Sequence, residues 1–237
     1  MYHAFYALAA HDDIEKFELE DGVVRHAGAA LLAETSTIER IIVDAPSERR
    51  PEPPADRPAV PWESSITISA REAADCRPPE LDELIFDVAR VVGAWTVASV
   101  DVAEFERDWI GKATPGGKLS FLLRRSAGAD QGSYENWLSD AMVECTNRLG
   151  DVGGRYVLPL DAFVPGAEFE TIASFWFPND EALKTAMEGD GFGPLLASHL
   201  VDHAATRTHF SVEHRLVPNP NAWASTDMAV EPPEPHG

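Results

Sequence analysis

The sequence has few cysteines and few basic residues. Its 237 residues include two cysteines, Cys76 and Cys145, whose spacing matches no metal-binding pattern. Lysine and arginine number 19 against 40 aspartates and glutamates, a formal net charge of −21. Because nucleic-acid binding needs clustered basic side chains, we expect no nucleic-acid partner. Two incidental thiols are typical of a reducing compartment, so we expect a cytoplasmic protein.

Several sequence signals are also missing. No run of about 18 apolar residues occurs, so we expect no membrane-spanning helix. The N-terminus lacks the basic stretch of a signal peptide. No G-x-G-x-x-G, Walker-type or G-x-S-x-G motif is present, which argues against a nucleotide cofactor and against a nucleophile elbow.

The composition is that of a folded protein, with 44% hydrophobic and 25% charged residues. The length indicates one or two domains with a sizeable core. Residues 46–63 are rich in proline and charge and predict a loop, and residues 111–117 resemble a linker. We therefore expect an N-terminal unit at 1–112, a C-terminal unit at 117–218 and an extended tail at 219–237.

The two units carry the same predicted order of elements. In the first, β-branched runs and helical spacing predict strands at 2–9, 38–44, 65–69 and 94–102 and helices at about 12–34 and 80–93, the latter ending at Gly93 as a C-cap. In the second they predict strands at 119–124, 155–160, 171–177 and 208–216, a helix at 133–149 with Ser133 as N-cap, and a helix from 181 capped by Asn179 or Asp180.

This order, β-α-β-β-α-β in each half, predicts an α+β fold of two ferredoxin-like repeats. Such a repeat leaves one apolar face of its sheet without helices, and that face must be buried. We expect the two antiparallel sheets to pack face to face within the chain. Two independent domains are the alternative.

Four segments of the second half resemble a known family: KLSFLLRR at 118–125, YENWL at 134–138, FWFPNDEAL at 175–183 and HFSVEH at 209–214. Together they resemble EthD-type proteins of the dimeric α+β barrel superfamily, over about residues 118–217. In the first half, Arg25-His26-Ala27 is similar to a His-Ala pair of that family's first helix. The resemblance implies a tandem fusion of two barrel halves. The second half has Asp140 or Ala141 where the family has histidine, so the halves are not equivalent.

His26 is the leading catalytic candidate, because histidine exchanges protons near neutral pH and the resemblance places it facing a cavity. A hydrogen-bonded histidine on a helix surface is the alternative. His3 and Tyr6 lie on the first strand, where alternation puts Tyr2 and Tyr6 on one face and His3 on the other. A Tyr6 hydroxyl inside the barrel would polarise a carbonyl, while core packing is the plainer interpretation.

Aromatic side chains would form the walls of a ligand pocket, although core packing is the default for each of them. The residues expected to bind substrate are Tyr2, Phe121, Trp137, Asp140, Phe175 and Phe177.

His199 and His203 stand at i, i+4, a spacing that suits a metal on a helix. No third ligand is identifiable, so we expect a solvated helix face and no bound metal. Haem enzymes share the superfamily's fold, and His199, His203 or His209 would then be the axial ligand. We expect no cofactor.

These observations predict a cofactor-independent lyase or isomerase that acts on a small hydrophobic, aromatic or polyketide-like carbonyl compound through histidine acid–base chemistry. The alternatives are a non-catalytic binding or accessory protein of an oxygenase or degradation pathway, and a cofactor-free monooxygenase. We expect a small hydrophobic ligand as partner and a monomer or homodimer.

Overall fold

A computed structural model describes most of the two predicted units. The residues described are 2–28, 31, 37–46, 60, 62–76, 78, 81–97, 101–104, 117–162 and 169–216. Most of the predicted loop at 46–63, most of the break at 111–117 and all of the predicted tail lie outside them.

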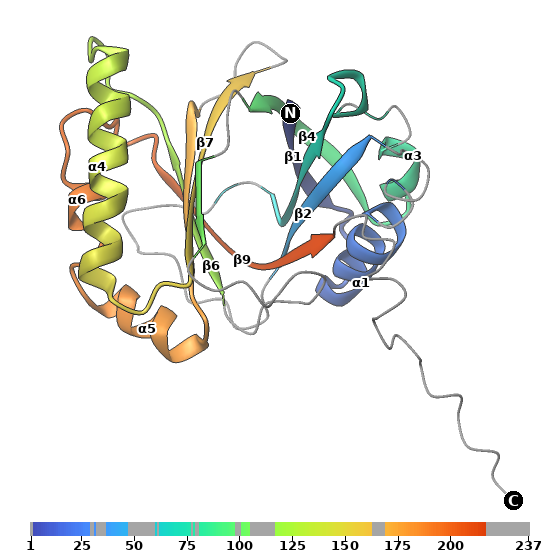
Figure 1. The fold of residues 1–237 in the computed structure, drawn as a ribbon. Coiled ribbons are helices and arrows are strands. Elements are labelled where there is room, and N and C mark those ends of the chain that lie inside the picture. The colour runs from blue at the N-terminus through green and yellow to red at the C-terminus, as the bar shows by residue number, and fades with distance from the viewer. Residues whose placement is uncertain are drawn as a thin grey trace, which may run out of the picture.

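Among the described residues, one antiparallel sheet of nine strands lies at the centre, in the order β4-β1-β3-β2-β9-β6-β8-β7-β5. Strand β4 also pairs with β7, so the sheet curls round into a barrel-like closed shape (Figure 1). Its strands are β1 Tyr2–Ala10, β2 Ile38–Pro46, β3 Ser64–Ala70, β4 Ala89–Val97, β5 Asp101–Glu104, β6 Lys118–Leu123, β7 Gly154–Ala162, β8 Thr171–Trp176 and β9 Arg207–Leu216.

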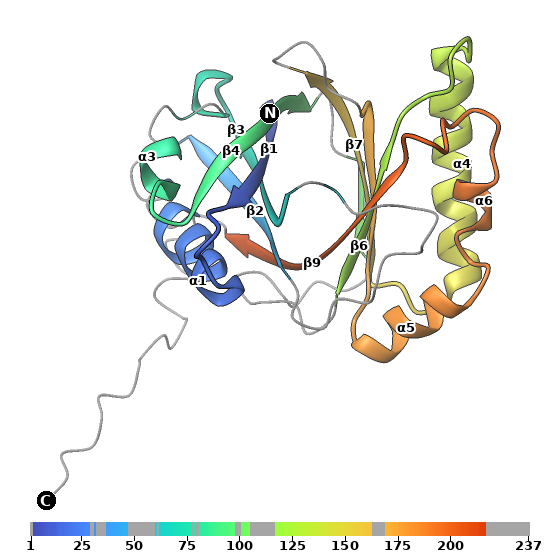
Figure 2. The same ribbon diagram turned by 180° about the vertical axis from the view of Figure 1, so that it is seen from behind.

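Helices cover the outside of this sheet in two groups. Figures 1 and 2 show α1 and α3 beyond the strands of the first half, and α4, α5 and α6 beyond those of the second. None of the described helices combines the length and the apolar character needed to cross a membrane. The helical segments are α1 Lys16–Asp21, the π-helix η1 Gly22–Gly28, the 3-10 turn η2 Ala74–Cys76, α3 Leu81–Ile85, α4 Gln131–Leu149, α5 Asp180–Glu188 and α6 Gly193–Leu196.

The two halves share this sheet and are joined at two seams. Strand β2 pairs with β9, which sets Asp44 opposite Glu213, and β4 pairs with β7, which sets Trp95 opposite Ala162. The strand groups face each other between the helices (Figure 1). Because hydrogen bonds run across both seams, the halves are not independent domains.

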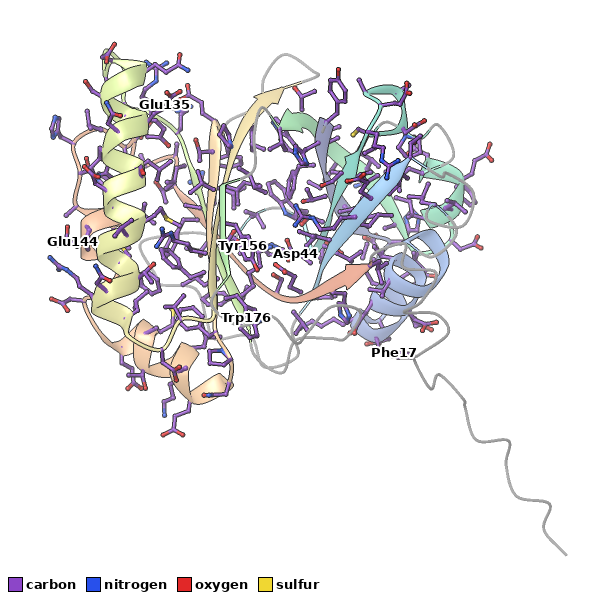
Figure 3. All side chains as sticks on the ribbon, in the orientation of Figure 1. Phe17, Asp44, Glu135, Glu144, Tyr156 and Trp176 are labelled. Carbon is purple, nitrogen blue, oxygen red and sulfur yellow. The ribbon has the colours of Figure 1, made fainter. Side chains whose placement is uncertain are left out.

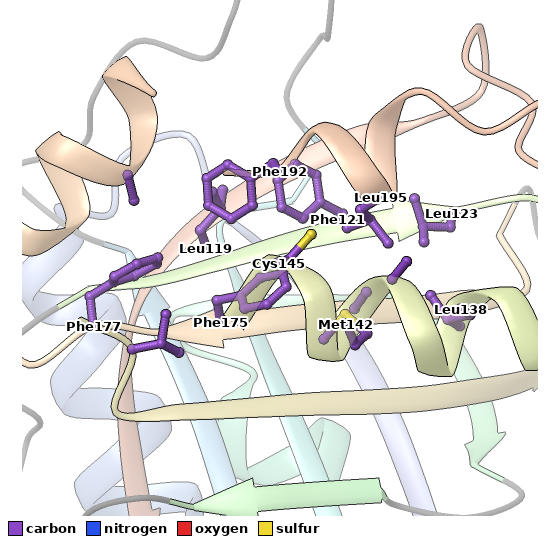
Figure 4. Packing of buried hydrophobic residues seen from close by; sticks show 14 of the residues in the cluster. Leu119, Phe121, Leu123, Leu138, Met142, Cys145, Phe175, Phe177, Phe192 and Leu195 are labelled. Atoms are coloured by element: carbon purple, nitrogen blue, oxygen red, sulfur yellow. The ribbon is translucent and has the colours of Figure 1, made fainter. Parts of the chain in front are cut away.

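Alternation along each strand separates an inner from an outer face. On β6, Leu119, Phe121 and Leu123 pack outward in one core with α4 and α6, as the close view in Figure 4 shows. Leu122 points inward and joins a different cluster with Phe5 and other side chains from both halves. A third cluster lies under α1 and α3. The described residues therefore form one core inside the barrel and one beneath each helical layer.

Short side-chain caps set where the helices of the second half begin. Asn179 caps α5, and its Oδ1 accepts a hydrogen bond from the Ala182 amide at 2.8 Å, which confirms the predicted cap. Helix α4 starts earlier than predicted, at Gln131, because Asp130 rather than Ser133 is its N-cap. The Asp130 carboxylate accepts from the Ser133 amide at 2.8 Å.

The predicted helix at 80–93 is wrong over its second part. Helix α3 ends at Ile85, and Ala89–Val97 forms strand β4 against β1. Gly93 is therefore a strand residue and not a C-cap. A methyl group on its Cα would overlap the ring of Trp95, two residues further along the same strand. Pairing with β1 overrides the helical spacing here, as tertiary contacts often do.

The predicted helix at about 12–34 is also only partly correct. Helix α1 occupies Lys16–Asp21 and continues as the π-helix η1 to Gly28. The last predicted strand of the first half, 94–102, is divided between the end of β4 and the separate strand β5.

We predict that Gly93→Ala lowers the free energy of unfolding by about 1–3 kcal/mol, because the new methyl group must displace the Trp95 ring. Urea unfolding followed by circular dichroism measures the change. Gly132→Ala in the first turn of α4 is the control, since its Cβ would meet a single neighbour, Asp130 Oδ2, at 3.4 Å. Equal stability of Gly93→Ala and the natural sequence would contradict the packing described.

Candidate functional site

A buried ion cluster lies inside the barrel at the β2–β9 seam. The Lys118 ammonium is 2.9 Å from Asp44 Oδ1 and 2.8 Å from Glu213 Oε2. Ser65 donates a hydrogen bond to Asp44 at 3.2 Å, and the Tyr156 hydroxyl donates to Glu213 Oε1 at 3.4 Å. Asp44 and Tyr156 lie between the two strand groups in Figure 3. The cluster thus links β2 of the first half to β6, β7 and β9 of the second.

This cluster keeps Lys118 charged. Burial by itself lowers the pKa of the Lys118 ammonium, but the carboxylates of Asp44 and Glu213 outweigh that effect and raise the pKa above its usual value. An ammonium held this way does not act as a base or a nucleophile at neutral pH. We interpret Lys118 as a clamp between the halves and not as a catalytic group.

Aromatic side chains fill another part of the barrel interior. The ring centroids of Trp62 and Trp95 are 6.2 Å apart, and those of Trp62 and Phe169 are 6.1 Å apart. Trp62 belongs to the predicted proline-rich loop, and the same segment is held to β9, where the Val60 amide donates to the Thr208 carbonyl at 3.3 Å. The loop therefore contributes core residues to the barrel.

The candidate site lies on the opposite, outer face of the second half. A pocket of about 270 Å³ lies against β6 and β9, beside α5 and α6. This volume is near the lower end of small-molecule sites. The lining residues are mainly apolar: Leu119, Phe121, Met187, Gly189, Asp190, Phe192, Gly193, Leu196 and Thr208.

The turn between α5 and α6 shapes this pocket. The Gly193 amide donates to the Asp190 carbonyl at 2.8 Å, which closes the turn and starts α6. Phe192 anchors it, because its ring lies 5.1 Å from the Phe121 ring and 5.4 Å from the Phe175 ring (Figure 4). Burial of an aromatic side chain such as Phe192 stabilises the folded state by roughly 1.5–3 kcal/mol, and this holds the turn against the sheet.

Thr208 is the unusual member of the lining. It lies opposite Phe121 in the β6–β9 pairing and is 1% exposed. Its hydroxyl oxygen is buried and has no hydrogen-bond partner within the described part of the chain. A buried hydroxyl without a partner is unfavourable by about 1–3 kcal/mol, and such groups are few in folded proteins. Its place beside an apolar pocket makes it a candidate ligand contact.

The predicted substrate-binding residues fall into three environments. Phe121 lines the pocket, whereas Phe175 and Phe177 are buried in the surrounding core. Trp137 packs against that core from α4, with its ring 5.6 Å from the Tyr134 ring, and Asp140 is exposed on the same helix.

Tyr2, His3 and Tyr6 do not come together in one site. Tyr2 is 54% exposed, and the buried Tyr6 hydroxyl donates to the Cys76 carbonyl at 2.6 Å beneath the first helical layer. His3 lies on the other face, with Nδ1 2.9 Å from the Ser69 hydroxyl. Burial, with the nearby charge of Arg40, lowers the pKa of His3, so this ring is neutral at pH 7.

His26 lies in the π-helix η1, but its side chain is outside the described residues, and its catalytic role stays a prediction. The expected helix face with His199 and His203 is wrong, because α6 ends at Leu196 and a turn follows. His203 Nε2 lies 2.9 Å from the Ser198 carbonyl. His209 Nε2 lies 3.3 Å from the Glu63 carbonyl. No cluster of metal-ligating side chains occurs among the described residues.

Sequence reasoning missed most of the pocket. Thr208 fell within a predicted strand, and alternation alone placed it on the same face as Phe210, but nothing in the sequence indicates that its hydroxyl lacks a partner. Phe192 lies within a glycine-rich stretch, and Leu196 follows it; the turn of this stretch depends on packing of Phe192 against Phe121 and Phe175.

Comparison with known proteins supports the fold. No family model and no curated sequence matches the chain. Among solved structures, an anthrone oxidase-like protein superposes with a TM-score of 0.57 at 9% identity, covering 91% of this chain and 93% of that one. A protein of Lactobacillus acidophilus, named as a suspected monooxygenase, has a TM-score of 0.52 at 10% identity and covers 90% and 93%.

A haem-bound variant of DypB from Rhodococcus jostii also superposes, with a TM-score of 0.50 at 9% identity, covering 91% of this chain and 92% of that one. At such identities the likeness concerns the fold alone. The chain has a mixed α+β fold with an antiparallel, barrel-like sheet, similar to dimeric α+β barrel folds.

The pocket residues do not fit haem. Haem iron is held by histidine, cysteine, tyrosine, or methionine together with histidine, and of these side chains the described lining contains only Met187. Asp190, the ionisable side chain of the lining, has the wrong charge to pair with a haem propionate.

We predict that Lys118→Met lowers the free energy of unfolding by about 3–5 kcal/mol, because Asp44 and Glu213 then stay buried without their cation. Lys184→Met is the matched control. Its exposed ammonium lies 3.8 Å from Glu188, and its loss changes stability by less than about 0.5 kcal/mol. If Lys118→Met does not fold, the triple variant with Asp44→Asn and Glu213→Gln restores folding. Equal effects of the two lysine variants would contradict the clamp.

We predict that His3 makes the fold less stable as the pH falls through 6.5. The pKa of His3 is lower in the folded chain, so the unfolded chain takes up the proton first and stability is lost on acidification. His3→Asn removes this contribution. Urea unfolding at pH 7.5 and pH 5.5 measures the free energy of unfolding of both proteins. If it changes with pH equally in the variant and in the natural sequence, folding does not lower the pKa of His3.

Proposed function

We propose that this protein is an enzyme that binds a small, largely apolar compound carrying one oxygen group in the outer pocket of its second half. The observation that supports this most directly is the buried Thr208 hydroxyl, which has no hydrogen-bond partner among the described residues and lies beside an apolar pocket of about 270 Å³. A ligand oxygen placed there gives the hydroxyl its missing hydrogen bond, while the ligand's apolar part contacts Leu119, Phe121 and Leu196.

We also propose that the chain is a tandem of two ferredoxin-like repeats, the second of them EthD-like. The strand orders β4-β1-β3-β2 and β9-β6-β8-β7 support the repeat, because both follow the same connectivity. The EthD-like character rests on the four sequence segments between residues 118 and 217.

We propose that the reaction is an oxidation without a bound cofactor. We prefer it to the lyase or isomerase chemistry that was expected from the sequence. Both kinds of reaction need a side chain that accepts a proton, and Asp190, an exposed residue, is the one ionisable group of the described lining. Structural neighbours are named as an anthrone oxidase-like protein and a suspected monooxygenase. A lyase acting through His26 stays the second candidate.

Anthrone, a neutral tricyclic ketone, is a suitable test substrate. Its oxidation converts the ring methylene to a second carbonyl: one oxygen atom of O2 enters the product and the other leaves as water with the two methylene hydrogens. Oxygen uptake above the protein-free rate supports oxidation. If anthrone binds tightly but neither oxygen uptake nor any product is detected, the result indicates the alternative of a non-catalytic accessory protein.

We predict that Leu196→Trp abolishes anthrone oxidation, because the indole fills the pocket, while circular dichroism stays unchanged. Val143→Trp, at an exposed position on α4, is the control and retains activity. Full activity in Leu196→Trp would show that the reaction takes place elsewhere in the molecule.

We predict opposite stability effects for two neighbouring threonines. Thr208→Val leaves the free energy of unfolding unchanged or raises it by up to about 1 kcal/mol, since an unpartnered hydroxyl is removed. Thr206→Val lowers it by about 1 kcal/mol, since the Thr206 hydroxyl donates to the Asp202 carbonyl at 3.1 Å. Urea unfolding measures both, and a large loss of stability in Thr208→Val would mean that its hydroxyl is already satisfied.

A further inference from the structure

The charge of the pocket restricts what it can bind. Among the nine described residues that line it, Asp190 is the one with an ionisable side chain, and none carries a positive charge. A carboxylate or phosphate that enters an apolar pocket loses its hydration and needs a cation in exchange. The lining offers an anion no such partner.

Two basic residues near the pocket are already engaged. Lys118 directly precedes Leu119, but alternation along β6 turns its side chain into the barrel, where Asp44 and Glu213 bind it. Arg148 Nη1 lies 3.6 Å from the position that a Cβ on Gly193 would take. Its guanidinium pairs with Glu144, one turn away on α4, so this pair adds no net charge.

The polar capacity of the inner wall is small. Thr208 supplies one hydroxyl, which either donates or accepts a hydrogen bond. The side chains of Leu119, Phe121, Met187, Phe192 and Leu196 offer no strong donor or acceptor. A ligand with several polar groups would leave most of them unpaired, whereas one oxygen on an apolar frame matches the wall.

We infer that the pocket selects uncharged ligands: an alcohol, phenol or ketone whose single oxygen hydrogen-bonds to Thr208, with acids, phosphates and haem excluded. This inference rests on the proposed function, because it names the ligand class of the same pocket. It places selectivity in two features, the unpartnered hydroxyl and the lack of a cation in the lining.

Three probes of nearly equal shape test the inference on the full-length protein: 1-naphthol, naphthalene and 1-naphthoate at pH 7.5. Fluorescence titration measures the binding of 1-naphthol, and displacement of 1-naphthol measures the other two. We expect 1-naphthol to bind roughly 3–10-fold more tightly than naphthalene, the factor expected for one hydrogen bond. We expect 1-naphthoate to bind at least about 30-fold more weakly than 1-naphthol.

Variants assign these preferences to residues. Thr208→Val removes the preference for 1-naphthol over naphthalene, and Thr206→Val, outside the pocket, keeps it. Arg148→Met leaves the weak binding of 1-naphthoate unchanged, since the guanidinium is paired with Glu144. Met187→Lys, at a side chain that lines the pocket, improves 1-naphthoate binding by supplying the missing cation.

The outcomes separate the inference from the proposed function. If 1-naphthoate binds as tightly as 1-naphthol, the pocket is a ligand site but its selectivity is not the one inferred. If Thr208→Val keeps the 1-naphthol preference, the hydroxyl is not the anchor. If Leu196→Trp binds all three probes as tightly as the natural sequence does, the probes do not bind in this pocket, and the proposed function itself fails.

Discussion

The β2–β9 seam is the constraint on which the rest of the structure depends. There, Lys118 is bound by Asp44 from the first half and by Glu213 from the second, inside the barrel. A buried ammonium without both carboxylates would be strongly unfavourable, so the cluster favours one register of the two halves over its neighbours. With that register set, each strand has an inner and an outer face, and every later feature follows from which residues fall on which face.

The place of the candidate site follows from this division. The inner face is occupied by the ion cluster and by the aromatic cluster around Trp62 and Trp95. The outer face of β6 and β9 carries Phe121 and Thr208, both buried, and beside it the chain turns between α5 and the short helix α6, which begins at Gly193. A pocket lies beside this turn, and its lining includes Thr208, whose buried hydroxyl has no hydrogen-bond partner among the described residues.

Local chemistry explains which predictions from the sequence were correct. The Asn179 cap and the long helix that ends at Leu149 depend on neighbours a few residues away, so the sequence pattern was sufficient to predict them. The helix at 80–93 was expected from helical spacing and from Gly93 as its C-cap, and the helix around His199 was expected from the i, i+4 spacing of two histidines. Pairing of β4 with β1, and the turn after α6, overrode that periodicity.

From the sequence alone follow the acidic charge, the order of most strands and helices, and the alternation that puts Tyr6 and His3 on opposite faces of the first strand. Each of these depends on residue type and on spacing along the chain. Only the tertiary structure decided that Tyr6 belongs to a core, that Trp62 packs inside the barrel, and that the buried hydroxyl of Thr208 has no hydrogen-bond partner among the described residues. Whether a buried hydroxyl has a hydrogen-bond partner depends on side chains that folding brings close from distant parts of the chain. Spacing along the sequence does not predict which side chains these are.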